Sequence, residues 1–196
     1  MLPDWLIPKG SFTEIKVNVT FLEMTRDALV EPVWLPEGYS VTRFFSCALP
    51  LYRSLYEKIG ENYGWWMRRP MPDRLLKDIL SDPSVFFMVL KNPEGKEIGF
   101  YELDMRKHAD AHLAYFGLVP EAIGQGLGKA LLNHAIRETF EDANWRLRVN
   151  TSTLDHPHAL RNYRRAGFVQ TAVIPEVWNV SDEYITEELR QKIIST

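Results

Sequence analysis

Residues 115–132 read YFGLVPEAIGQGLGKALL, and this stretch decides the fold. Apolar residues enter it, and three alternate glycines follow at Gly124, Gly126 and Gly128. After them an apolar face recurs at helical spacing, on Leu131 and its neighbours, as far as Phe140. Glycines between a strand and a helix let the backbone approach an anion, which the helix N-terminus favours. The stretch therefore predicts a strand, an anion-binding loop and a helix.

Three other interpretations of the loop can be compared residue by residue. A Walker loop needs a glycine at Ile123 and a hydroxyl at Ala130, and this chain has neither. A dinucleotide fingerprint needs G-x-G-x-x-G, whereas this chain has G-x-G-x-G, late in the sequence. A tight turn that binds nothing stays open as the third interpretation.

Working outward, hydrophobic periodicity predicts the remaining elements. Strands are expected at 14–23, 85–90, 97–105, 111–119, 145–151 and 168–174, and helices at 48–61, 71–80, from the loop to 141, from 157, and at 182–194. Asp73 is a possible cap for the second helix. We expect one α/β (α+β) domain over residues 1–196, in which residues 1–40 form an N-terminal extension with the first strand.

Composition limits the classes of function. Of 196 residues, 45% are hydrophobic, and the formal net charge is −3, so no general attraction to nucleic acid is expected. We find no signal peptide and no run long enough to span a bilayer, and therefore expect a cytoplasmic protein with no membrane partner. The single cysteine, Cys47, fits a reducing compartment and is expected to be a buried, inert thiol.

Residues 159–168 read ALRNYRRAGF and extend the argument. The glycine loop resembles the R/Q-x-x-G-x-G/A pyrophosphate loop of the GCN5-related N-acetyltransferase (GNAT) superfamily. The later segment is similar to its second signature, A-x-x-x-Y-x-x-x-G-F, and the two have the expected order and separation. The resemblance covers roughly 86–173, and residues 56–69 and 151–157 look like a bacterial subgroup of largely uncharacterised members.

This resemblance implies a GNAT-like domain whose mixed, mostly antiparallel sheet is flanked by helices and splayed at the acetyl-CoA strand. It implies an N-acetyltransferase that moves an acetyl group from acetyl-CoA, its co-substrate, to the amine of a small molecule or peptide in a ternary complex. The alternative is a catalytically weak or silent CoA-binding regulatory module. A homodimer is possible.

The coenzyme contacts also follow from the resemblance. They are Leu118, Val119, Gly124, Gln125, Gly126, Leu127, Gly128, Lys129, His156 and Leu160. The chain departs from the superfamily at two positions. Ile123 replaces the usual Arg or Gln, so backbone amides must hold the phosphates, and His156 replaces an Asn that contacts the pantetheine arm.

For the chemistry, the resemblance assigns the general acid to Tyr163 and the oxyanion contact to a backbone N–H near Leu118. A phenol keeps its proton at neutral pH and can protonate a departing thiolate. The general base stays open between His112, Glu102 on the preceding strand, and a chain of waters.

Two further sets of residues have candidate roles. Trp66 and Arg69 lie where the superfamily builds its acceptor site, and could grip an apolar acceptor that carries an acidic group. The spacing of His108, Asp110 and His112 would suit metal ligands on a strand, but a turn at 108–110 breaks that alternation. We therefore expect no metal.

Overall fold

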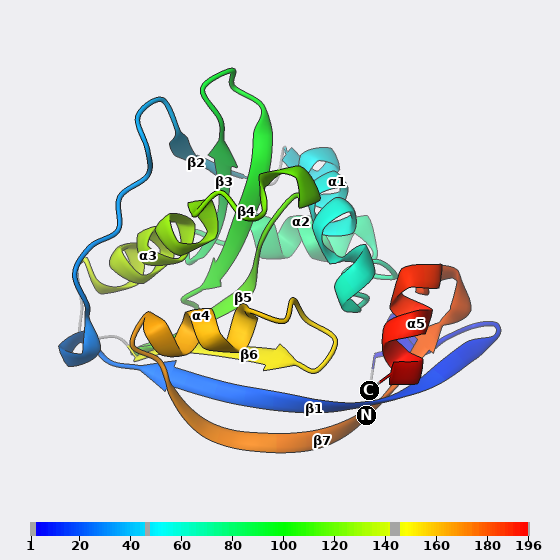
Figure 1. The fold of residues 1–196 in the computed structure, drawn as a ribbon. Coiled ribbons are helices and arrows are strands. Elements are labelled where there is room, and N and C mark those ends of the chain that lie inside the picture. The colour runs from blue at the N-terminus through cyan, green and yellow to red at the C-terminus, as the bar shows by residue number, and fades with distance from the viewer. Residues whose placement is uncertain (1–2, 46–47, 142–145, 196) are drawn as a thin grey trace.

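A computed structural model describes residues 3–45, 48–141 and 146–195. Cys47 and Trp145 lie outside the described residues. The strands are β1 Phe12–Met24, β2 Ser40–Phe44, β3 Val85–Lys91, β4 Glu97–Asp104, β5 Asp110–Leu118, β6 Arg146–Ser152 and β7 Val169–Ser181. The helices are α1 Leu49–Gly60, α2 Asp73–Ser81, α3 Leu127–Phe140, α4 Ala159–Arg165 and α5 Glu187–Ser195. The strands form one seven-stranded sheet in the order β2-β3-β4-β5-β6-β1-β7 (Figure 1).

The sheet is antiparallel everywhere except between β5 and β6. These two strands run parallel and pair only from Asp110 opposite Arg146 to His112 opposite Arg148. Beyond that rung the two strands separate: β5 continues to Leu118 and β6 to Ser152 without further pairing between them. The expected mixed, mostly antiparallel and splayed sheet is confirmed.

Strand β1 lies inside the sheet. Its second half pairs with β6, from Val19 opposite Ser152, and nearly its whole length pairs with β7. The first half of β1 and the second half of β7 therefore extend past β6 as a two-stranded ribbon, which α5 covers (Figure 1). Alternating burial along β1 confirms the strand expected at 14–23.

Two strands differ from the expectation. Strand β2 was not expected, because its five residues, Ser40–Phe44, do not alternate clearly between apolar and polar. In the structure one of its polar residues packs on an aromatic ring, since the guanidinium of Arg43 lies 3.7 Å above the ring centre of Phe86. Strand β7 continues to Ser181, past the predicted end at 174, because β1 offers it a partner along its whole length.

The helices cover both faces of the sheet. An added Cβ at Gly117 on β5 would lie 2.4 Å from Ile59 of α1, whereas one at Gly128 of α3 would lie 3.6 Å from Leu118. Neighbouring residues of a strand point to opposite faces, so α1 and α3 lie on opposite sides of β5. No helix in the described ranges is both long enough and apolar enough to cross a membrane.

The predicted apolar face of α1 is buried, including Tyr52, Tyr56 and Ile59. For α2, Pro72 occupies the cap position and Asp73 lies in the first turn, so the expectation that Asp73 caps the helix is wrong. The Asp73 carboxylate accepts a hydrogen bond of 2.7 Å from Arg53 instead.

Candidate active site

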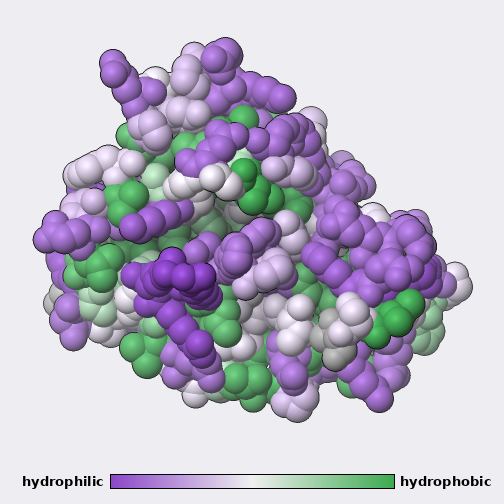
Figure 2. All heavy atoms as spheres, viewed as in Figure 1, coloured by the Kyte–Doolittle hydropathy of each residue, from purple (hydrophilic) through white to green (hydrophobic). Residues whose placement is uncertain are grey.

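A cleft of about 1140 Å³ opens where β5 and β6 separate. One end lies at the glycine loop, and the other reaches the ribbon of β1 and β7. Seen from the side of Figure 1, hydrophilic residues cover α4, and apolar residues show in the hollow between α3 and α4 (Figure 2). A cleft of this size and largely apolar lining suits a cofactor together with a second small molecule.

The glycine loop has the geometry of an anion site. Gly124 and Gly126 adopt φ angles of +84° and +79°, which favour glycine, and α3 begins immediately afterwards at Leu127. Within the described part of the chain no side chain caps this helix, and its first turn, which is described throughout, contains no acidic residue. Gly124, Gly126, Gly128 and Lys129 all line the cleft. The loop therefore offers backbone N–H groups, the positive end of a helix and one ammonium to a bound phosphate.

Four other expected coenzyme contacts lie outside the cleft lining. Leu127 and Val119 are buried. The Gln125 side chain donates a 2.9 Å hydrogen bond to the Glu121 carbonyl, and Leu160 lines a separate, shallow depression beside the arginines of α4.

The C-terminal half of β5 presents an unpaired strand edge to the cleft. The Val119 N–H donates to the Ile98 carbonyl of β4, at 2.9 Å. Backbone groups of successive residues point to alternate sides of a strand, so the N–H groups of Leu118 and Phe116 point away from β4 toward the splay. An extended ligand can pair with this edge as an additional strand would.

Tyr163 of α4 lines the cleft. Its ring lies 6.4 Å from the ring of Phe116 and 5.7 Å from that of Phe168, and only 6% of the residue is exposed. Burial, together with the nearby charge of Asp155, raises the pKa of the Tyr163 hydroxyl well above its usual value of 10.0. The phenol therefore keeps its proton at neutral pH.

A β-bulge at Ala114 changes which face of β5 the following residues occupy. Leu113 opposes Leu103 and Tyr115 opposes Glu102, so Ala114 is the extra residue. Because of this insertion, His112 and Tyr115 lie on the same face of the sheet, the face that α1 covers.

His112 lines the cleft at the last rung between β5 and β6, opposite Asp104 on β4. Burial and the neighbouring Arg148 lower the pKa of His112 below 6.5, although Asp104 partly opposes this shift. The imidazole is therefore neutral at pH 7 and can accept a proton.

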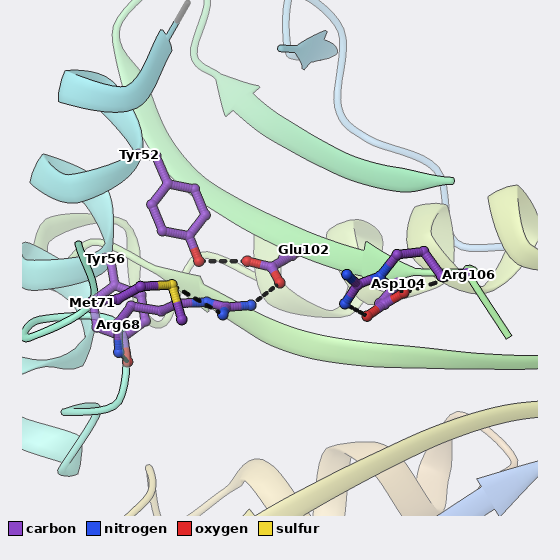
Figure 3. Close-up of polar contacts among 7 residues, drawn as sticks. All are labelled: Tyr52, Tyr56, Arg68, Met71, Glu102, Asp104 and Arg106. Carbon is purple, nitrogen blue, oxygen red and sulfur yellow. Dashed lines mark hydrogen bonds and ion pairs between the residues drawn. The ribbon is translucent and has the colours of Figure 1, made fainter. Parts of the chain in front are cut away.

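Glu102 belongs to a buried network beside the cleft (Figure 3). Its carboxylate accepts hydrogen bonds from the Tyr52 hydroxyl and, at 2.5 Å, from the Arg68 guanidinium. The Glu102 side chain is 1% exposed and does not line the cleft, whereas Arg68 does. The backbone N–H of Arg68 donates a hydrogen bond of 3.2 Å to the Tyr56 hydroxyl, and this bond fixes the Arg68 backbone.

Of the two expected acceptor contacts, Trp66 lines the cleft and Arg69 does not. The Arg69 guanidinium lies 5.5 Å above the ring centre of Tyr184 and donates to the Tyr184 carbonyl at 3.5 Å. Its neighbour Arg68 provides the guanidinium of the cleft wall. Sequence gave no signal to distinguish these adjacent arginines.

Asp155 is a cleft residue that the sequence analysis missed. Its carboxylate accepts hydrogen bonds from the Thr151 hydroxyl at 2.7 Å and the Ser152 N–H at 2.8 Å, which closes the turn after β6. Burial raises the pKa of Asp155 although these bonds oppose the shift. The signal that could have found it is a hydroxyl residue four positions before an aspartate at the end of a strand.

His156 follows in the same turn and lines the cleft. Its Nδ1 accepts a 3.1 Å hydrogen bond from the His158 N–H, and burial lowers its pKa. The described residues contain no cluster of three or more potential metal ligands. Asp110, one of the metal candidates, binds Lys107 and Arg148, and the turn before it contains Ala109 at φ +58°.

Three solved structures illustrate the similarity of the fold. A GCN5-related N-acetyltransferase from Sphaerobacter thermophilus matches with a TM-score of 0.66 at 16% identity, over 89% of this chain and 56% of that one. One from Kribbella flavida matches with a TM-score of 0.56 at 16% identity, over 83% and 58%. The ribosomal-protein-S18-alanine N-acetyltransferase of Escherichia coli matches with a TM-score of 0.56 at 17% identity, over 73% and 94%.

The chain thus spans little more than half the length of the first two of these proteins. At the level of sequence, residues 52–168 match the model of the acetyltransferase (GNAT) family, which is more than half of the 196 residues. The matched range includes the glycine loop, the splay and Tyr163. The chain therefore belongs to the acetyltransferase (GNAT) family.

Proposed function

We propose that the protein transfers an acetyl group from acetyl-CoA to the amine of a small molecule or peptide by direct attack in a ternary complex. One observation carries this proposal. A single cleft joins an anion-binding helix start at Gly126 to a protonated phenol at Tyr163 and a neutral imidazole at His112.

The residues present fit acetyl-CoA along the length of the cleft. The backbone amides that open α3, with Lys129, would hold the pyrophosphate, and Ile123 leaves this role to them. The free edge of β5 at Leu118 and Phe116 would pair with the amide groups of the pantetheine arm. Leu118 lies against Gly128, so this residue belongs to the phosphate half of the coenzyme site.

The position of Leu118 conflicts with an oxyanion role if His112 is the base. Six residues of strand separate the two, which is about 20 Å at roughly 3.3 Å per residue. The thioester carbonyl therefore cannot accept a hydrogen bond at Leu118 while its carbon is attacked by an amine at His112. We propose that the oxyanion contact lies instead at the bulge around Ala114, two residues from His112 and two from Phe116, which packs on Tyr163.

Bound acetyl-CoA supplies a thioester carbonyl as the group to be attacked. His112 takes the proton of the acceptor ammonium, directly or through water, and so frees its lone pair. As the C–N bond forms and the C–S bond breaks, the Tyr163 hydroxyl gives its proton to the departing sulfur. A second proton leaves the new amide nitrogen for solvent, and solvent returns one to Tyr163.

Glu102 is better suited to positioning than to proton transfer. Both of its oxygens accept hydrogen bonds, one from Tyr52 and one from Arg68, and it lies behind the cleft wall. We propose that Glu102 holds the Arg68 guanidinium in that wall. The Glu102→Gln variant should then keep the acidic limb of the pH–rate profile.

The test has two measurements. Calorimetric titration should show saturable binding of acetyl-CoA, and a thiol-release assay over amines and peptide N-termini should show turnover. Absence of saturable binding would refute the proposal. Saturable binding with no transfer to any amine would favour the alternative, a regulatory CoA-binding module.

A further inference from the structure

We infer that the acceptor is an amine with an apolar body and a second positive charge at its far end, which Glu176 and Trp178 bind. This inference rests on the proposed function and specifies the acceptor class. It is carried by the charges and aromatic rings at the end of the cleft remote from the glycine loop.

Charge is the first argument. The arginine and lysine residues among the described lining of the cleft are Arg68 and Lys129, and its carboxylates are Asp104, Asp155 and Glu176. Lys129 belongs to the phosphate end. The acceptor end of the cleft thus contains more carboxylates than cations.

Most of these charged side chains already form ion pairs or hydrogen bonds within the protein. Arg68 is neutralised by Glu102 at 2.5 Å, and Asp104 by Arg106 at 2.6 Å. Asp155 accepts the hydrogen bonds that close its turn. Glu176 is different, because no lysine or arginine in the described part of the chain forms an ion pair with it.

The contact that Glu176 does make prepares it for a ligand. The indole N–H of Trp178 donates to its Oε2 at 2.7 Å. This bond fixes the carboxylate at the N–H edge of the Trp178 ring, next to its face, without neutralising the carboxylate charge. A carboxylate next to a tryptophan ring is a favourable site for an ammonium, by charge and by cation–π attraction.

The surrounding surface fits an apolar body. Trp66 and Trp178 both pack on the small cluster of Ile15, Val17, Val19, Leu154, Val180 and Leu189. Both rings line the cleft, as does Trp5 from the segment before β1. An acceptor that reaches from the catalytic groups to Glu176 would pass between aromatic side chains.

Strand register places this pair within reach of the splay. Glu176 of β7 is opposite Val17 of β1, and two residues further Val19 is opposite Ser152, the last residue of β6. Val19 and Ser152 both line the cleft. Glu176 therefore lies beside the open end of β6, across the cleft from β5.

The alternative acceptor is one with an acidic group, and among the described residues the end of the cleft remote from the glycine loop offers it no arginine or lysine without an ion pair. The Arg69 guanidinium contacts Tyr184, outside the cleft lining, and Arg68 shares its charge with Glu102. An acidic acceptor would also meet the unneutralised Glu176. Charge repulsion would weaken its binding.

The test compares three acceptors of one length: an α,ω-diaminoalkane, the corresponding alkylamine and the corresponding ω-amino acid. The diamine should have a kcat/KM about ten-fold above that of the alkylamine, a typical value for one charge-assisted hydrogen bond, and the amino acid should be the poorest. Glu176→Gln should reduce the preference for the diamine over the alkylamine to within about two-fold.

Glu94→Gln is the matched control, because it makes the same charge change in the exposed turn between β3 and β4. It should preserve the preference. Equal rates with all three acceptors, or a preference for the amino acid, would overturn the inference while thiol release still supported acetyl transfer.

Binding of the diamine by calorimetry, in the presence of CoA, gives a readout that does not depend on turnover. Binding that weakens about ten-fold in Glu176→Gln supports the inference. Binding that is unchanged in the variant overturns it.

Discussion

The ion pair of Arg68 and Glu102 allows a quantitative prediction. Replacing Arg68 with methionine keeps an unbranched side chain but leaves the Glu102 carboxylate, 1% exposed, without its cation. Tyr52 still donates one hydrogen bond to it. A buried charge that loses its partner is strongly destabilising, so we expect a large fall in the free energy of unfolding.

The magnitude follows from the geometry. Two unit charges about 4 Å apart attract by about 4 kcal/mol at an effective dielectric constant of about 20. Removal of one member of a buried pair typically costs about 3–5 kcal/mol, in agreement. With a urea m-value of about 2 kcal/mol/M, the unfolding midpoint of Arg68→Met should fall by about 2 M.

Urea denaturation followed by tryptophan fluorescence measures this shift. The control is Lys58→Met, whose pair with Glu121 has a similar distance, 2.6 Å, but is exposed, so its midpoint should stay near that of the parent protein. The double variant Arg68→Met with Glu102→Gln should recover at least half of the loss. A midpoint for Arg68→Met as close to the parent's as that of Lys58→Met would refute the reasoning.

Three further predictions concern the cleft. Tyr163→Phe should lower kcat by about a hundred-fold at unchanged affinity for acetyl-CoA, measured by thiol release and calorimetry; unchanged kcat would remove the phenol from proton transfer. In the parent enzyme kcat/KM should fall only below pH 6.5, because burial and Arg148 lower the pKa of His112 and it must be neutral to act as the base. His112→Gln should lose this acidic limb along with most of the rate, and a limb that persists would exclude His112. Gly126→Ala should lower the free energy of unfolding by about 1 kcal/mol, because its added Cβ meets nothing within 4 Å but a φ of +79° strains alanine; an unchanged midpoint in urea denaturation would contradict this.

Local signals explain what the sequence could predict. The glycine loop, the start of α3 and the apolar face of α1 each depend on residues a few positions apart, so their spacing is visible in the chain. The same holds for the segment around Tyr163, where Gly167 at φ +101° ends the turn after α4. Neighbouring atoms determine these features.

Features that depend on distant partners could not be read in this way. The bulge at Ala114 inserts one residue into β5, and no change in the pattern of side chains marks it. The face of the sheet that His112 occupies could therefore not be predicted from the sequence. Arg68 and Arg69 are adjacent, and only the position of buried Glu102 decides which of them reaches the cleft. The role inferred for Glu176 depends on β7 extending along β1, whose place inside the sheet no local pattern reveals.

The position of β1 between β6 and β7 also has a consequence for how the chain folds. The Thr13 hydroxyl donates to Asp182, 169 positions away, and β1 pairs with strands that emerge from the ribosome long after it. Contacts between residues so distant in sequence form slowly, because a long loop must close before they stabilise anything. During synthesis the apolar side of β1, with Ile15 and Val17, therefore stays exposed until its partner strands have been made. We expect this strand to be prone to aggregation and to chaperone binding during that time.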